Sequence, residues 1–106
     1  MTAKQVILDY INNQDEELCY IAKEIWDHPQ VALEETFASK LLADKLEADG
    51  FSIEWGAGGM PTAFVAEWGQ GAPIIGFLGE YDALPGLSQE LSADRSAIES
   101  GGPGHG

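Results

Sequence analysis

The side chains best suited to chemistry lie in the run Gly79–Gln89 (GEYDALPGLSQ), which holds two carboxylates two positions apart, Glu80 and Asp82. On an extended segment, residues two apart point to the same side. The run follows Ile74–Leu78, whose continuous hydrophobicity predicts a central strand covered on both faces. Because ligands of open α/β sheets bind at the carboxyl ends of strands, Glu80 and Asp82 are candidates for a metal or catalytic role. Spacing alone favours the alternative, a polar strand end at which Asp82 caps the next turn.

Few other side chains could carry chemistry. Cys19 is the only cysteine, which excludes an internal disulfide, and within a predicted helix it is expected to be a small buried hydrophobe. The two histidines, His28 and His105, provide no zinc-finger spacing. His28 falls in a turn at a helix end and His105 in a glycine-rich tail, so both are expected to be solvated surface residues.

Two helices are predicted to precede these residues. Apolar residues at helical spacing predict one helix over residues 3–26, with Thr2 and Gln5 as a capping box and the pair His28-Pro29 ending it. The second helix is predicted over residues 34–49, with Gly50 closing it in a Schellman motif.

Three strands are predicted next, over residues 51–55, 62–68 and 74–78, with a hairpin-like return at residues 69–71 between the last two. Residues 86–106 have no periodicity and are expected to form a long glycine-rich loop. The order α-α-β-β-β does not close a layered fold, because helices that cover both faces of a sheet normally alternate with its strands. The expectation is therefore an α/β chain that forms the N-terminal part of something larger.

The charge balance excludes several classes of partner. Against 18 Asp and Glu the sequence has 5 Lys and Arg, a net charge of −13, and such a field repels nucleic acid and anionic membranes. No stretch approaches the roughly 20 apolar residues of a membrane span. The N-terminal segment is too polar for a secretory signal, so the expected location is cytoplasmic.

Most of the region from Ile25 to Gln89, above all the run GEYDALPGLSQ, resembles the zinc-dependent amidohydrolase/carboxypeptidase family. That family includes hippurate hydrolases, auxin-conjugate amidohydrolases and aminobenzoyl-glutamate hydrolases. The resemblance resumes at the segment 104–106 (GHG) and is strongest to the aminobenzoyl-glutamate utilization protein B group. It implies a three-layer α/β/α zinc-peptidase-like catalytic domain, of which residues 1–85 would be a truncated N-terminal portion. Residues 86–106 would lead to a Cys-Gly-His-Asn metal-ligand motif that would follow Gly106.

The resemblance also implies roles for single residues. Many relatives carry an H-x-D motif at the end of this strand, with the histidine as a metal ligand. Glu80 stands at the histidine position and Asp82 at the aspartate position, as in the amidohydrolase branch. Asp82 is therefore the implied catalytic-site residue, as an outer-shell or positioning carboxylate. Glu80 and His105 are weaker substrate or outer-shell candidates, and no residue of this chain is an implied metal ligand.

The implied parent enzyme uses a divalent metal, zinc or manganese, and a glutamate general base to hydrolyse the amide bond of an N-acyl amino acid. The best-matching substrate is p-aminobenzoyl-glutamate, split into p-aminobenzoate and glutamate by a homo- or hetero-oligomer. The chain alone lacks the metal ligands and the base, so it is expected to be inactive and to hold no metal tightly. The alternative is a non-catalytic acidic interaction module that binds a partner through an uncovered sheet face.

Overall fold

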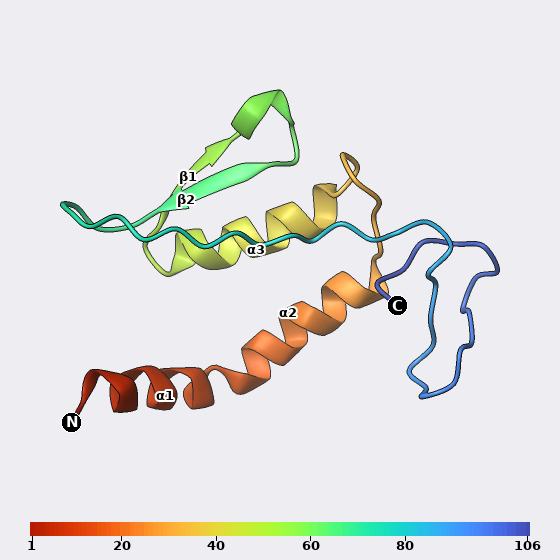
Figure 1. The fold of residues 1–106 in the computed structure, drawn as a ribbon, viewed down its shortest axis with the longest axis horizontal. Helices are drawn as coiled ribbons and strands as arrows, with labels where there is room; N and C mark the ends of the chain where they lie inside the picture. The colour runs from red at the N-terminus through yellow and green to blue at the C-terminus, as the bar shows by residue number, and fades with distance from the viewer.

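The computed structural model describes all 106 residues and shows a mixed α/β chain with three helices and a two-stranded antiparallel sheet. This agrees with the α/β class predicted from the sequence. The elements, drawn in Figure 1, are α1 (Ala3–Asn13), α2 (Asp15–Asp27), α3 (Thr36–Ala48), β1 (Ser52–Trp55), the 3-10 turn η1 (Ala57–Gly59) and β2 (Phe64–Glu67).

The helix predicted over residues 3–26 is divided in two at Gln14. The main-chain N–H of Gln14 is shared between two carbonyl groups of α1, and three acidic residues follow at the start of α2, where the helix dipole favours them. The Thr2 hydroxyl accepts the main-chain N–H of Gln5 at 3.2 Å, as the predicted capping box requires. The Gln5 side chain binds Asp9 instead of Thr2, so only half of that box forms.

The expectation that Cys19 is buried is wrong. Its side chain lies on an exposed face of α2, and Ile21 is the one buried residue of that helix. A single helical stripe is covered by the rest of the chain, so an apolar residue outside that stripe stays in contact with solvent.

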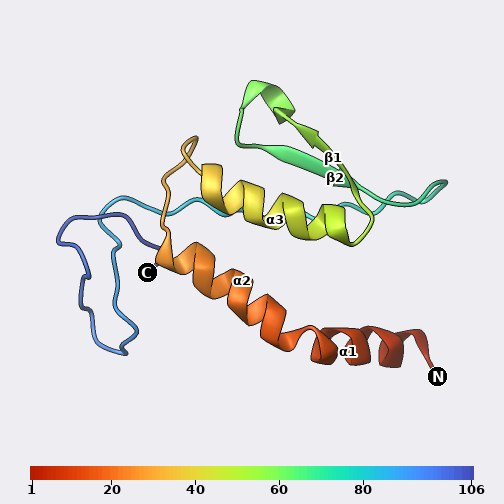
Figure 2. The ribbon, with the colours of Figure 1, turned by 180° about the vertical axis from the view of Figure 1, so that it is seen from behind.

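Helix α3 ends as its sequence predicts. Gly50 has a φ of +100°, its N–H donates to the Glu47 carbonyl at 3.0 Å, and the N–H of Phe51 donates to the Leu46 carbonyl at 3.0 Å. These two bonds form the Schellman motif. The helix contacts α2 on one side and the β1–β2 hairpin on the other, as Figure 2 also shows from behind.

The two predicted strands before residue 70 are present and pair with each other. Ser52 pairs with Glu67 and Trp55 with Phe64, and the chain reverses through the intervening segment 56–63. The return predicted at residues 69–71 is therefore wrong, because the reversal comes one strand earlier.

The strand predicted over residues 74–78 does not form. The segment is extended, but its backbone pairs with no other strand, and the side chains of Ile74, Phe77 and Leu78 are 91%, 96% and 93% exposed. Hydrophobicity signals that a segment suits a sheet interior, whereas a strand also needs neighbours that hydrogen-bond to its edges. In this chain β1 and β2 pair only with each other and segment 74–78 does not join them, so the order is α-α-α-β-β.

The core is small. Of 106 residues 8 are buried, and the apolar ones are Ile21 of α2, Ala38 and Ala43 of α3, and Ala83. Ala83 belongs to the GEYDALPGLSQ run, so the core includes the segment with the candidate carboxylates. None of the helices combines the length and the hydrophobicity needed to cross a membrane.

Candidate functional site

The GEYDALPGLSQ run is attached to the connection between α2 and α3. The N–H of Ala83 donates to the Gln30 carbonyl at 2.7 Å, and Val31 and Ala83 form an isolated parallel bridge. The Ala83 side chain is 1% exposed. The residue after Asp82 is thereby fixed in the core although no regular strand passes through it.

A second attachment closes the loop that follows. Leu84 and Gly104 form an antiparallel bridge in which each N–H donates to the other's carbonyl, at 2.9 and 3.1 Å, and the N–H of Ser88 donates to the Gly102 carbonyl at 3.0 Å. Figure 1 shows the loop leaving the body and returning beside its own start. His105 directly follows Gly104 of this bridge, and Ala83 directly precedes Leu84.

A third attachment starts from Tyr81, which lies between the two candidate carboxylates. Its hydroxyl donates to the Thr62 carbonyl at 2.5 Å, and the Thr62 hydroxyl donates to the Glu35 carboxylate at 3.1 Å. The Tyr81 ring stacks on Phe64 of β2 with centroids 6.1 Å apart. Burial raises the pKa of the Tyr81 phenol, and the nearby Glu35 carboxylate raises it further. The only sequence signal for this role is that Tyr81 lies between two carboxylates. The sequence does not indicate its hydrogen-bond partner, because Thr62 lies 19 residues away.

The three candidate residues predicted from the sequence differ in exposure. Asp82 is half-buried, whereas Glu80 and His105 are exposed. Neither carboxylate makes a hydrogen bond or an ion pair within the chain. The alternative in which Asp82 caps the following turn is therefore not what the structure contains.

The residues present do not form a complete metal site. No group of three or more histidine, cysteine, aspartate or glutamate side chains gathers at a position that could hold a metal ion. A zinc site in a protein has three or four protein ligands. Asp82, Glu80 and His105 would have to act together with groups outside the chain.

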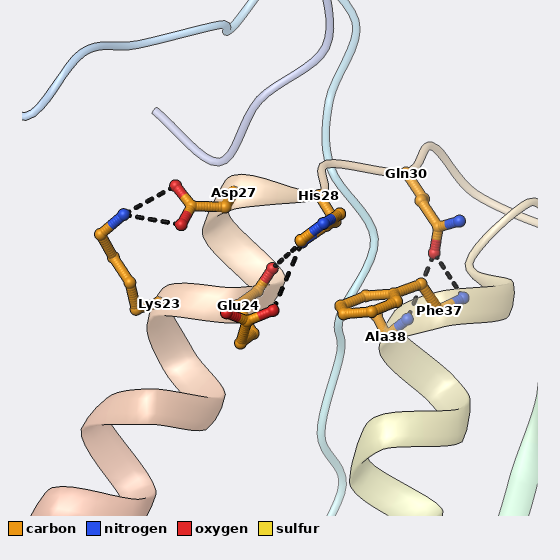
Figure 3. Close-up of polar contacts among 7 residues, drawn as sticks. All are labelled: Lys23, Glu24, Asp27, His28, Gln30, Phe37 and Ala38. Carbon is orange, nitrogen blue, oxygen red and sulfur yellow. Dashed lines mark hydrogen bonds and ion pairs between the residues drawn. The ribbon is translucent and has the colours of Figure 1, made fainter.

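The connection that holds Ala83 is itself well attached, as Figure 3 shows. His28 follows α2 and donates through Nδ1 to the Glu24 carbonyl at 2.8 Å, and its ring stacks on Phe37 of α3 with centroids 4.3 Å apart. His28 therefore links the end of α2 to the start of α3 while it remains solvent-exposed.

Most of the chain is similar in sequence to part of a known hydrolase. No protein-family profile matches the chain. One of the subunits of the p-aminobenzoyl-glutamate hydrolase of Escherichia coli (strain K12) is 44% identical over 87 residues, which are 81% of this chain and 18% of that protein. The chain thus spans less than a fifth of the length of this relative. The resemblance seen in the sequence is confirmed, and any continuous match of this length includes Gln30, Tyr81 and Asp82.

Proposed function

We propose that this chain forms the first part of the catalytic domain of a metal-dependent amidohydrolase that splits p-aminobenzoyl-glutamate into p-aminobenzoate and glutamate. The observation that carries the proposal is the 44% identity to the hydrolase subunit over 87 residues, a continuous stretch of which must include the attached residues Tyr81, Ala83 and Leu84. Since that relative is several times longer, the activity belongs to the longer protein, and the 106-residue chain by itself is expected to be inactive.

Asp82 is the residue that we assign to the site. Its carboxylate is half-buried and unpaired, while its neighbours Tyr81 and Ala83 are fixed through a hydroxyl and a main-chain N–H respectively. A carboxylate with a fixed backbone and no internal partner is suited to orient a group brought by the rest of the enzyme. Exposed Glu80 and His105 are secondary candidates for the same surface.

The zinc or manganese ion of the proposed enzyme would rest mainly on ligands outside this chain. The chain's own contribution is the Asp82 carboxylate, which would accept a hydrogen bond from a ligand side chain and so orient that ligand. The relative is named as a subunit, which supports a hetero-oligomer for the present protein as well. The single cysteine and the acidic composition are compatible with a cytoplasmic enzyme.

A segment exchange tests the proposal. The 87-residue matched segment of the Escherichia coli protein is replaced by the corresponding residues of this chain, and the chimera is expressed with whatever partner subunits the bacterial enzyme requires. Release of p-aminobenzoate from p-aminobenzoyl-glutamate is expected. The Asp82→Asn chimera should lose about 10- to 100-fold in kcat/KM, the usual cost of removing a residue that orients metal ligands.

Glu54→Gln is the matched control, because the Glu54 side chain is an exposed carboxylate on β1 that makes no hydrogen bond. This chimera should keep its activity. A folded chimera that releases no p-aminobenzoate would contradict the proposed substrate. Equal activity of the Asp82→Asn and Glu54→Gln chimeras would remove Asp82 from the site.

The non-catalytic interaction module stays as a second candidate because of one observation, the exposure of Ile74, Phe77 and Leu78. A module of this kind would bind a partner through that segment, whereas the longer enzyme would cover it with its own later residues. An inactive chimera, combined with a specific complex of the 106-residue chain in sedimentation, would favour the module.

A further inference from the structure

Gln30 lies in the connection between α2 and α3, and its side chain caps α3 from a distance. Its Oε1 accepts the main-chain N–H of Phe37 at 2.8 Å and that of Ala38 at 3.2 Å (Figure 3). The first N–H groups of a helix have no partner within the helix, so these two bonds satisfy groups that would otherwise be unpaired.

The other end of the same amide is also used. Nε2 of Gln30 donates to the Thr36 hydroxyl at 3.2 Å. The residue in the normal capping position, Glu35, makes no capping bond with its side chain. Glu35 instead accepts the Thr62 hydroxyl, so Gln30 replaces it as the cap of α3.

The main chain of Gln30 makes a different contact. Its carbonyl oxygen accepts the N–H of Ala83 at 2.7 Å, and the adjacent residue Val31 bridges to Ala83. Three hydrogen bonds hold the Gln30 side chain against the first turn of α3. Its main-chain carbonyl holds Ala83, the residue that follows Asp82. One residue therefore sets the position of the Asp82 segment relative to the start of α3.

We propose that Gln30 is a positioning residue for Asp82, a role that rests on the proposed function of Asp82. Without the side-chain bonds, the Gln30 peptide could turn its carbonyl away from Ala83 and two amides of α3 would lose their acceptor. The backbone around Asp82 would then keep the attachments through Tyr81 and Leu84 but lose the one through Ala83, the residue that follows Asp82.

Two substitutions separate this role from general stability. Gln30→Ala removes the acceptor of both α3 amides. Gln30→Glu keeps the acceptor, and a negative charge at a helix N-terminus is favourable. It removes the amide N–H that donates to the Thr36 hydroxyl, but that hydroxyl can donate to the second carboxylate oxygen instead. Gln5→Ala is the control, because the Gln5 side chain binds only the exposed Asp9 side chain on α1.

The first measurement is amide hydrogen exchange in the 106-residue chain. At the Ala83 N–H, Gln30→Ala should speed exchange by about 5- to 10-fold, the population change expected from the loss of a helix cap. Gln30→Glu should restore most of the protection, and Gln5→Ala should leave it unchanged. Unchanged exchange at Ala83 in Gln30→Ala would overturn the proposal. If Gln30→Ala fails to fold, loss of Ala83 protection in folded Gln30→Glu would overturn it as well.

The second measurement uses the chimeric hydrolase. Gln30→Ala should lower kcat with little change in KM, and Gln30→Glu should recover most of the kcat, because the geometry of Asp82 changes while substrate contacts do not. Full kcat in the Gln30→Ala chimera would overturn the positioning role. A chimera inactive even with Gln30 in place would count against the proposed function instead, and the exchange result would still decide whether Gln30 holds Ala83.

Discussion

Tyr81 contributes more to the shape of the candidate site than either carboxylate beside it. Its hydroxyl bonds to the Thr62 carbonyl, its ring stacks on Phe64, and Thr62 continues the chain of contacts to Glu35. Replacing Tyr81 by Phe keeps the ring and removes the hydrogen bond. We expect a loss of about 1 kcal/mol in the free energy of unfolding, measured by urea denaturation. Tyr20→Phe is the control, since Tyr20 is 57% exposed and makes no side-chain hydrogen bond.

The same residue gives the stability a pH dependence. Burial raises the pKa of Tyr81 in the folded chain above its ordinary value of 10.0. The unfolded chain therefore releases this proton at lower pH than the folded chain does. The contribution of Tyr81 to stability is complete below pH 10.0 and is lost as the pH rises through the higher folded-state pKa. Tyr81→Phe should flatten the stability profile above that pH. Equal slopes for Tyr81→Phe and Tyr20→Phe would contradict the burial of the phenol.

Individual residues show which contacts can be predicted from the sequence and which cannot. The Schellman closure at Gly50 was predictable because all of its atoms lie within six consecutive residues. The cap by Gln30 was not, since a capping box places the side chain within the first turn, and Gln30 lies six residues before Thr36. The resemblance points to Asp82. The residues that hold its segment, Thr62 and Gly104, are distant in sequence and could not be predicted.

At the level of elements, local patterns predicted the helix and strand types better than their pairing. The two strands before residue 70 and the end of α2 agree with the sequence. The segment 74–78 does not, because a strand depends on neighbours that a hydrophobic pattern cannot supply. The division of the first helix at Gln14 is not predictable either, since glutamine is compatible with a helix and the break lies in the backbone dihedrals of this one residue.

The Leu84–Gly104 bridge is the element-level feature that closes the long loop, and Gly104 is the position of that bridge at which a side chain does not fit. A Cβ at residue 104 would overlap the main-chain carbonyl of Leu87. Gly104→Ala should therefore open the Leu84–Gly104 bridge and speed amide exchange at Leu84 by about 10-fold or more, as for a locally opened segment.

Gly76→Ala is the matched control for that substitution, because a Cβ at residue 76 meets no atom within 4 Å. It should leave the exchange at Leu84 unchanged. If Gly104→Ala and Gly76→Ala gave the same exchange rate, the close approach of residues 87 and 104 would not be needed for closing the loop.

The molecule as a whole is open for its length. Its radius of gyration is 16.3 Å, while a compact domain of this size has about 13 Å. Eight buried residues cannot supply the hydrophobic burial of an ordinary domain. Strongly exposed apolar side chains also occur along α1, so the uncovered surface extends beyond the segment 74–78. A chain built this way is expected to gain stability from further polypeptide, which agrees with the proposed longer hydrolase.

The exposed apolar side chains of segment 74–78 should affect dye binding and self-association, which can both be measured. It combines exposed apolar side chains with a backbone unpaired along both edges, and such a segment can pair with a second copy or bind a hydrophobic dye. The double substitution Phe77→Ser and Leu78→Ser should lower the fluorescence of bound anilinonaphthalene sulfonate and shift the sedimentation profile toward monomer. Leu91→Ser, which removes a 77% exposed side chain from the long loop, should change neither measurement. A wild-type chain that is monomeric and binds no dye would contradict the exposure of this segment.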